Sequence, residues 1–166
     1  MEQQFLDAYE KYADAIFRHC YFRVYNRELA RDLVQETFTR AWNQISKGVF
    51  IENIRAFLYR VATNLIIDES RKKKAYSLDT LLEQGFSPAV DQQTDIEHKL
   101  EGQELMRIMR RLDDDDRQIV IMRYIDDLTP KEIAEILHLS ENVASVRIHR
   151  AIKKVRKISD SREEYI

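Results

Sequence analysis

The amino-acid sequence predicts an all-α protein with two small helical domains, a flexible linker between them and a helix-turn-helix in the second domain. Glycine and proline are scarce, at 3 and 2 among 166 residues, whereas the turns of a β-rich protein need both. Apolar residues recur three and four positions apart along most of the chain, as on one buried helix face. This periodicity is lost between Ala75 and Asp95 and then resumes, so two helical units are expected.

The composition narrows the class of protein. Hydrophobic residues make up 44% of the chain, which is enough for packed cores, and the 27 basic and 29 acidic residues nearly cancel. Only an uneven distribution of these charges could therefore indicate a nucleic-acid partner. We expect a cytoplasmic protein, because no charged-then-apolar leader begins the chain and no apolar run is long enough to span a bilayer. The single Cys20 is expected to be a small buried hydrophobic residue.

Three amphipathic helices are predicted in the first domain, residues 1–74. The first runs from about Glu2 to Val24, and the third from about Asn53 to Lys73, ending in a basic run. The second has the cleanest pattern and ends at Lys47-Gly48, where glycine suits a left-handed cap. Its apolar face carries Ala30, Leu33, Val34, Thr37, Phe38, Ala41, Trp42 and Ile45.

A non-periodic segment, residues 75–96, is predicted to be the linker, with a short helical turn around Leu78–Leu82. It contains Gly85 and Pro88 among several polar residues. About twenty residues at ~3.5 Å each could reach roughly 70 Å when fully stretched. The two domains could therefore occupy separate surfaces of a large partner.

The second domain, residues 97–166, begins with a helix predicted to end near Leu112. The acidic run Asp113–Asp116 then has two readings, a metal site or the start of a helix. Consecutive helical residues point in different directions, which disfavours a shared ion, and acidic residues suit a helix N-terminus.

A helix-turn-helix is predicted next. Thr129-Pro130-Lys131-Glu132 has the pattern of a capping box with proline at the first helical position. The short helix that it opens ends at a tight turn, His138-Leu139, and Ser140 then caps a longer helix that runs to about Ile158. This succession is typical of a DNA-binding motif.

The longer helix concentrates positive charge. Residues 142–158 contain six basic side chains and no acidic one, as expected of a helix that contacts phosphates. A merely solvated basic helix is the alternative, but such a helix has no use for the outward Val143 and Val146, which could contact thymine methyl groups. The residues predicted to contact DNA are Ser140, Asn142, Val143, Val146, Arg147, Arg150 and Lys153.

The polar, basic end of the third helix is a second candidate nucleic-acid surface. On its own this evidence is weak, because a basic helix end also suits the helix dipole. The candidate residues are Arg60, Thr63, Asn64, Asp68, Arg71 and Lys72.

These segments together resemble the extracytoplasmic-function (ECF) sigma factors of the sigma-70 family. The segment Asp32–Trp42 resembles the family's polymerase-binding segment, and Ala56–Asp68 resembles its promoter-melting and downstream-element segment. Residues Arg117–Arg156, which include Lys131-Glu132-Ile133-Ala134, resemble the family's C-terminal domain. The three matches follow the family's order and cover nearly the whole chain.

The resemblance implies a function in transcription initiation, without a cofactor, a metal or a catalytic step in this chain. It implies that Asp32, Gln35, Glu36 and Arg40 grip the β′ clamp helices of core RNA polymerase. The third helix would engage the −10 promoter element as single-stranded DNA, and the helix after Ser140 would enter the major groove of the −35 element. It also implies an anti-sigma partner. Departures from the family's usual residues at Thr63, His138, Val143 and Ser145 bear on the promoter sequence rather than on the class.

Two other classes are weighed against this one. A helix-turn-helix repressor or response regulator would bind duplex operator DNA without polymerase, but the long linker and the basic third helix fit it less well. An enzyme is disfavoured, since neither a phosphate loop nor a nucleophile elbow occurs and the four histidines lack metal-ligand spacing. His19 is expected at a helix surface or boundary, and His149 beside DNA.

Overall fold

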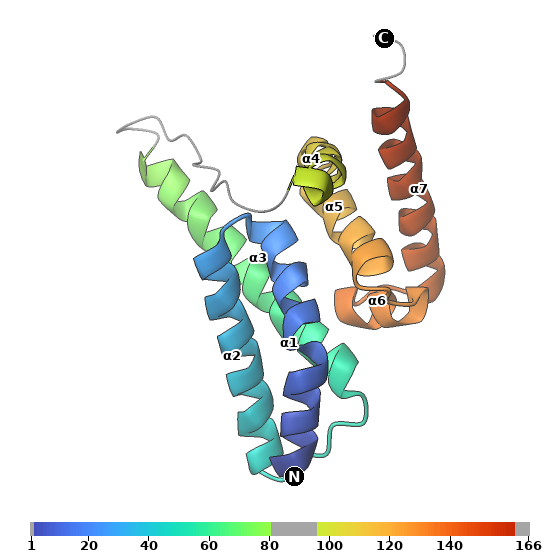
Figure 1. The fold of residues 1–166 in the computed structure, drawn as a ribbon. Coiled ribbons are helices and arrows are strands. Elements are labelled where there is room, and N and C mark those ends of the chain that lie inside the picture. The colour runs from blue at the N-terminus through green and yellow to red at the C-terminus, as the bar shows by residue number, and fades with distance from the viewer. Residues whose placement is uncertain (1, 81–95, 162–166) are drawn as a thin grey trace.

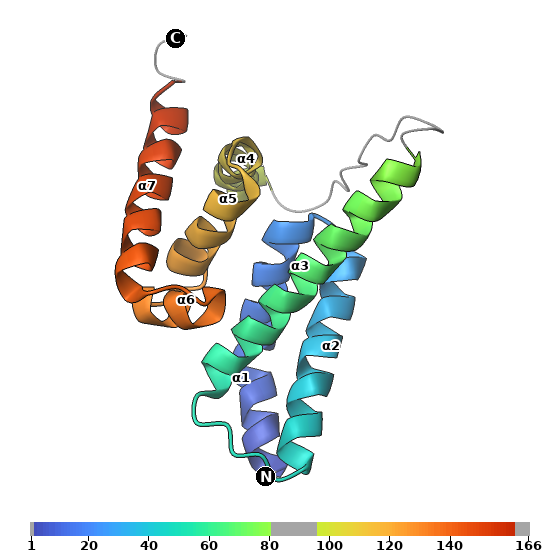
Figure 2. The same cartoon turned by 180° about the vertical axis from the view of Figure 1, so that it is seen from behind.

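The computed structural model describes residues 2–80 and 96–161, and the secondary structure of these residues is entirely helical (Figure 1). This confirms the predicted fold class. One group of helices comprises α1 to α3, and a second comprises α4 to α7, seen from both sides in Figures 1 and 2. The elements are α1 (Glu2–Val24), α2 (Arg27–Ser46), α3 (Ile54–Thr80), α4 (Ile96–Arg111), α5 (Asp114–Val120), the π-helical η1 (Ile121–Ile125), α6 (Pro130–Leu137) and α7 (Glu141–Asp160). None of the helices in these ranges combines the length and apolar character needed to cross a membrane.

Helices α1, α2 and α3 all pack on one another around a shared apolar core. The side chain of Asn26 caps α2 by accepting a hydrogen bond from the backbone N–H of Leu29 at 3.0 Å. Gly48, just beyond α2, has φ +78°, so the predicted left-handed cap is confirmed. Cys20 is fully buried in this core, as predicted.

Helix α3 is longer than predicted. It continues to Thr80, so residues 75–80 of the predicted linker are helical. The residues from Glu69 to Thr80 contain neither glycine nor proline and include several good helix formers, which accounts for the extension. The predicted turn around Leu78–Leu82 falls partly within α3, and the rest of it lies outside the described residues.

The acidic run at the start of α5 is a helix N-terminus, which confirms the preferred reading. Asp113 is the N-cap and accepts a hydrogen bond from the backbone N–H of Asp116 at 2.9 Å. Arg117 pairs with Asp114 at 2.9 Å, and Lys154 of α7 pairs with Asp113 and Asp116. These carboxylates therefore neutralise neighbouring cations and suit the helix dipole.

The helix-turn-helix forms as predicted. Thr129 Oγ1 accepts from the N–H of Glu132 at 3.2 Å, and the Glu132 carboxylate accepts from the N–H of Thr129 at 2.8 Å, which completes the capping box. His138 occupies the left-handed region at φ +56°, and Ser140 caps α7. Ala144, Ile148 and Ala151 form the buried face of α7.

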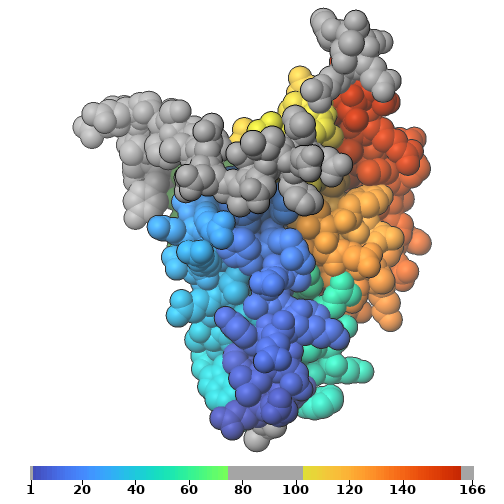
Figure 3. Space-filling model, in the orientation of Figure 1, coloured from blue at the N-terminus to red at the C-terminus, as the bar shows by residue number. Residues whose placement is uncertain are grey.

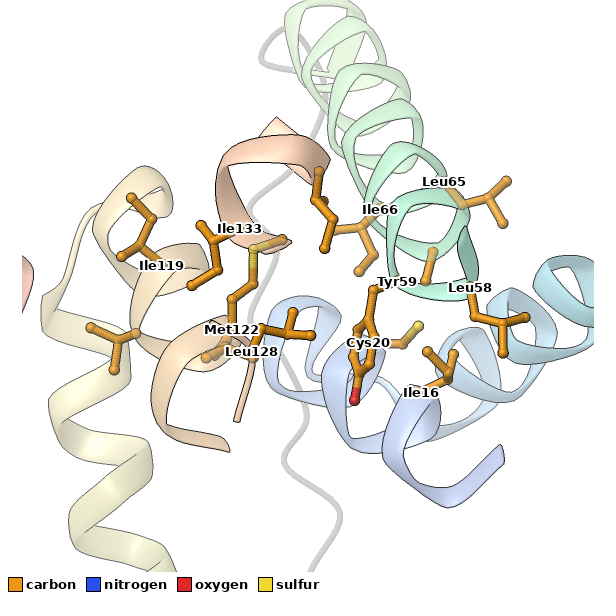
Figure 4. Packing of buried hydrophobic residues seen from close by; sticks show 14 of the residues in the cluster. Ile16, Cys20, Leu58, Tyr59, Leu65, Ile66, Ile119, Met122, Leu128 and Ile133 are labelled. Atoms are coloured by element: carbon orange, nitrogen blue, oxygen red, sulfur yellow. The ribbon is translucent and has the colours of Figure 1, made fainter. Parts of the chain in front are cut away.

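The two groups of helices pack against each other. Contacts join α1 to η1 and α3 to α6. Buried apolar residues form one continuous cluster that includes Tyr59 and Ile66 on one side and Met122 and Leu128 on the other (Figure 4). In the space-filling view the orange surface of the second group lies directly against the blue surface of α1 (Figure 3).

We predict that His138→Gly stabilises the protein. A side chain with a Cβ in the left-handed region is strained, and removing that strain is worth about 1 kcal/mol. For a chain of this size the expected rise in Tm is about 2–4 °C, measured by thermal unfolding followed by circular dichroism. Gly48→Ala is the matched control of opposite sign, because a Cβ there meets no atom within 4 Å and only the backbone strain changes. Equal Tm shifts for both variants would contradict this explanation.

Candidate nucleic-acid and polymerase interfaces

The outward face of α7 is open to solvent. Val143 and Val146 are 41% and 48% exposed, although their neighbours on this face are polar or basic. Helix α7 lies on the side of the molecule away from α1–α3 (Figures 1 and 2), so the first group of helices does not cover this face. The side chains predicted to contact DNA there are all exposed: Ser140, Asn142, Val143, Val146, Arg147, Arg150 and Lys153.

The basic residues of α7 lie on two surfaces, one beside the start of α5 and one facing solvent. On the first, Lys154 pairs with the carboxylates of Asp113 and Asp116. Ser140 already uses its hydroxyl oxygen to accept from the N–H of Val143 at 3.2 Å, which leaves the hydroxyl proton for another acceptor. The predicted face therefore has exposed basic groups around two exposed valines, an arrangement that can contact phosphates and base methyl groups together.

A second polar stripe follows one face of α3. Arg60, Asn64 and Asp68 are exposed at intervals of four residues, which places them along one side of the helix. Arg71 and Lys72 continue the exposed surface, and Lys72 pairs with Glu69 at 3.3 Å. The guanidinium of Arg60 lies over the ring of Phe57, 5.5 Å from its centroid. This stripe combines cations with an aromatic ring, as surfaces that bind single strands do.

Thr63 departs from the predicted set. Its side chain is only 1% exposed, and its hydroxyl lies 3.2 Å from His19 Nε2. Position 63 is three residues from Arg60 but turns toward α1 rather than toward solvent. In this arrangement Thr63 is inaccessible to DNA.

A cavity of about 540 Å³ lies beside Arg60 and was not predicted. The loop between α2 and α3 lines it together with Glu135 and Ile136 of α6. Phe50 in this loop is 82% exposed, which is unusual for so large an apolar side chain. The run Val49-Phe50-Ile51 directly after a glycine was the only signal in the sequence, because the rest of the cavity comes from a distant helix.

The residues predicted to bind polymerase lie on the exposed face of α2. Arg40 Nε donates to Glu36 Oε1 at 2.7 Å, and both side chains are about half exposed. Such an exposed pair contributes little free energy, so its members can exchange partners readily. Asp32 and Gln35 are exposed beside them.

A wide apolar groove of about 890 Å³ runs between α1 and α2, next to Gln35. Phe5, Tyr9, Phe38 and Trp42 line it, and their rings meet edge to face. The periodicity assigned Trp42 to the buried face of α2, yet it is 37% exposed. The sequence therefore did not predict this groove.

Comparison with known proteins identifies both groups of helices. Sigma-70 region 2 matches residues 8–76, and sigma-70 region 4 matches residues 102–155. The ECF RNA polymerase sigma factor SigW of Bacillus subtilis (strain 168) is 32% identical over 166 residues, which cover 94% of this chain and 89% of SigW. The chain belongs to the ECF sigma factors. Its function is therefore that of an RNA polymerase sigma factor, which binds the polymerase and promoter DNA in transcription initiation.

Other relatives agree with this assignment. The ECF RNA polymerase sigma factor SigM of the same organism is 31% identical over 138 residues, covering 81% of this chain and 82% of SigM. Two solved structures share the fold of the whole sigma factor. RpoE from Bartonella quintana, solved with the anti-sigma factor NepR, has a TM-score of 0.77 at 19% identity, covering 95% of this chain and 98% of that chain. CnrH, solved with the cytosolic domain of CnrY, has a TM-score of 0.72 at 22% identity, covering 97% of this chain and 90% of that chain.

His19 of region 2 lies at the contact between the two regions. The prediction of a surface or boundary position was wrong, because the side chain is fully buried. Its Nδ1 lies 2.6 Å from Asp126 Oδ2 of region 4, and its ring meets Tyr59 edge to face at 5.3 Å. No local signal could reveal this, since Asp126 lies 107 positions further along the chain.

The thiol of the neighbouring Cys20 is difficult to ionise. Burial and, to a smaller extent, the Asp126 carboxylate raise its pKa from 9.0 to about 12. The side chain is therefore a neutral thiol at physiological pH, and its reactivity is low.

We predict that Cys20 does not react with iodoacetamide in the folded sigma factor at pH 8. With a pKa of about 12 instead of 9.0, the thiolate fraction falls roughly a thousandfold, and burial slows the reaction further. Mass spectrometry measures the alkylated fraction, and the same reaction in urea is the control, where labelling should be rapid. Rapid labelling without urea would contradict the buried position.

Proposed function

We propose that this sigma factor reads the −35 element as duplex DNA with α7, holds the separated −10 strand with α3, and docks on the polymerase β′ clamp helices with α2. The observation that carries the proposal is the face of α7, where two exposed valines lie among basic side chains. The sigma factor performs no catalytic step itself. It acts in the cytoplasm, with the polymerase supplying the chemistry.

The face of α7 suits a major groove for two reasons. Residues 142–158 contain no acidic side chain, so phosphates on either side of the groove meet only positive or neutral groups. Val143 and Val146 lie near the start of the helix, where a recognition helix meets base edges. Contact with thymine methyl groups would bury apolar surface that is otherwise exposed to water.

The stripe on α3 suits a single strand better than a duplex. The Phe57 ring, with Arg60 over it, offers a stacking platform for an unpaired base. Asn64 can donate and accept hydrogen bonds at the edges of unpaired bases, and the Asp68 carboxylate can accept them. Arg71 and Lys72 add positive charge further along the same helix for the phosphates.

The polar face of α2 suits a protein partner. Asp32, Gln35 and Glu36 project from a helix whose opposite face is buried, so their positions are firmly held. The Arg40–Glu36 pair can open at little cost and offer both charges to a polymerase helix. Helix α2 lies away from region 4 (Figure 1), which leaves this face free.

An anti-sigma factor is a further proposed partner. RpoE and CnrH, which share this fold, were solved with NepR and with CnrY. An anti-sigma protein that covered the polar face of α2 would block polymerase docking directly. The apolar groove beside Gln35 gives such a protein additional surface to bury.

Reconstitution tests the proposal. The purified chain is mixed with sigma-free bacterial core polymerase, and the mixture is examined for co-elution and for promoter-dependent transcripts from genomic DNA fragments. Co-elution with discrete start sites is the expected result. If no complex forms and the chain alone shifts duplex DNA, the protein acts as a repressor and the proposal fails.

We predict that Arg147→Ala or Arg150→Ala weakens promoter recognition and leaves polymerase binding intact. Loss of one contact to guanine or phosphate costs about 1–3 kcal/mol, which is roughly a 5- to 150-fold loss of affinity. Holoenzyme binding to promoter DNA is measured by fluorescence anisotropy. Arg111→Ala, an equal change of charge at an exposed position at the end of α4, is the control. Loss of core polymerase affinity in the α7 variants would show that the roles are misassigned.

We predict the reverse for Gln35→Ala combined with Glu36→Ala. Removing two polar groups from the docking face should weaken core polymerase binding at least tenfold, or about 1.4 kcal/mol. Affinity is measured by titrating labelled sigma factor with core polymerase, and the α7 variants serve as controls. Undiminished affinity in the double variant would exclude this face as the docking site.

A further inference from the structure

A small cavity lies where the end of α1 meets α3 and the start of α5 (Figures 1 and 2). Its volume is about 280 Å³, close to the lower end of the roughly 300–1,000 Å³ that small-molecule sites occupy. The polar residues that line it are Arg23 of α1, Glu69, Ser70, Lys73 and Lys74 of α3, and Asp114 of α5. Arg23, Lys73 and Lys74 are called the cavity cations below.

Arg23 carries a guanidinium nitrogen that no acceptor reaches. Its Nη1 is buried, and it has no hydrogen-bond partner within the described part of the chain. Burial lowers the pKa of Arg23, and the carboxylate of Asp114 partly offsets this effect. An arginine nevertheless stays charged at neutral pH. Because a buried charge without a counter-charge costs free energy, an anion that supplied acceptors to Arg23 would be bound favourably.

The two carboxylates of the cavity already have partners. Asp114 pairs with Arg117 at 2.9 Å, and Glu69 pairs with Lys72 at 3.3 Å. None of the three cavity cations forms a salt bridge with any residue in the ranges 2–80 and 96–161. The cavity therefore offers unpaired positive charge, although both signs of charge line it.

A second polar atom without a partner lies at the same end of α1. The hydroxyl group of Tyr25 is buried and makes no hydrogen bond to a described residue. The guanidinium groups of Arg110 and Arg117 lie near its ring, 5.9 and 5.7 Å from the centroid. The end of α1 thus gathers cations beyond those that line the cavity, which favours an anion over a neutral ligand.

We propose that this cavity, between the end of α1 and residues 69–74 of α3, binds a small phosphate-bearing anion. Phosphate oxygens accept hydrogen bonds from guanidinium, ammonium and hydroxyl groups, and the cavity cations and Ser70 supply all three kinds of donor. Arg23 is the anchor, since a guanidinium fork can donate two parallel hydrogen bonds to one phosphate. The ligand is inorganic phosphate or a small phosphorylated metabolite. The inference does not rest on the functions proposed for α2, α3 or α7.

Titration of the isotope-labelled full-length chain with inorganic phosphate tests the site. The ionic strength is kept constant with sodium chloride, and nuclear magnetic resonance follows the backbone amides. The signals of Val24 and Ser70 should shift and reach saturation. Arg23→Met should weaken phosphate binding at least about tenfold, as expected for the loss of a hydrogen bond between charged groups.

The lysines are tested with a matched pair of double variants. Lys73→Gln combined with Lys74→Gln should weaken phosphate binding about fivefold or more, because two ammonium groups are lost. Lys47→Gln combined with Lys131→Gln removes the same charge at exposed positions outside the cavity and should leave the affinity unchanged. An equal loss in both double variants would show that phosphate responds only to net charge, and the inference would be overturned.

Arg23→Met is also a test that does not depend on a fragile variant. It removes a buried charge that has no described partner, so its Tm in chloride buffer should equal or exceed that of the parent chain. Added phosphate should raise the Tm of the parent more than that of the variant, because a ligand of the folded state stabilises it. The general effect of phosphate as a salt acts on both proteins alike. Equal rises in Tm would therefore contradict a site at Arg23.

Asp114→Asn tests the electrostatic basis with a change of opposite sign. This substitution removes a negative charge from the cavity wall, so phosphate should bind at least about threefold more tightly. Unchanged or weaker binding would overturn the inference.

Two further probes distinguish the sources of the phosphate group. Tighter binding of adenosine monophosphate than of inorganic phosphate supports a phosphorylated metabolite as the ligand, and the reverse order supports the free ion. A short single-stranded oligonucleotide is the third probe. If it displaces phosphate from the cavity at concentrations at which adenosine monophosphate does not, the cavity belongs to the DNA-binding surface, and the inference of a small ligand is overturned.

Discussion

The contact between His19 and Asp126 determines how the two halves of this sigma factor sit together. Burial of a carboxylate without a partner costs free energy, so the segment that carries Asp126 can pack only where a hydrogen-bond donor faces it. His19 supplies that donor from α1, and its second ring nitrogen is held by Thr63 of α3. One imidazole therefore links α1, α3 and region 4 within the apolar cluster that the two regions share. Arg55 reinforces the same geometry by binding the carbonyls of residues 126 and 127.

Features with local causes were predictable from the sequence. The capping box at Thr129, the cap at Ser140 and the left-handed Gly48 involve atoms within a few residues of one another, and each formed as expected. The predicted end of α3 near Lys73 is wrong, because the helix continues beyond the point where its apolar periodicity stops. Residues that favour a helix, but whose apolar members follow no helical period, extend α3 to Thr80.

The candidate binding surfaces were likewise predictable only where their causes are local. Helical periodicity alone predicted which residues of α2 and α7 are exposed, because each helix buries a single face against its neighbours. It failed for Thr63 and His19, which are buried against each other between α3 and α1, and His19 also contacts Asp126, far away in sequence. Periodicity also did not predict the cavity beside Arg60, because the loop after α2 and distant residues of α6 form its walls together. Periodicity describes one helix against its nearest core and says nothing of a second domain.

The position of the interface between the regions bears on what a bound partner can do. A ligand shifts an equilibrium only by the difference between its affinities for the two states. The polar face of α2 is exposed while the two regions pack together, and α2 lies away from region 4 (Figure 1). A partner that contacts only this face therefore does not favour separation of the regions. A partner that separated them would have to compensate for the loss of the contacts that His19 and Arg55 make with residues 126 and 127.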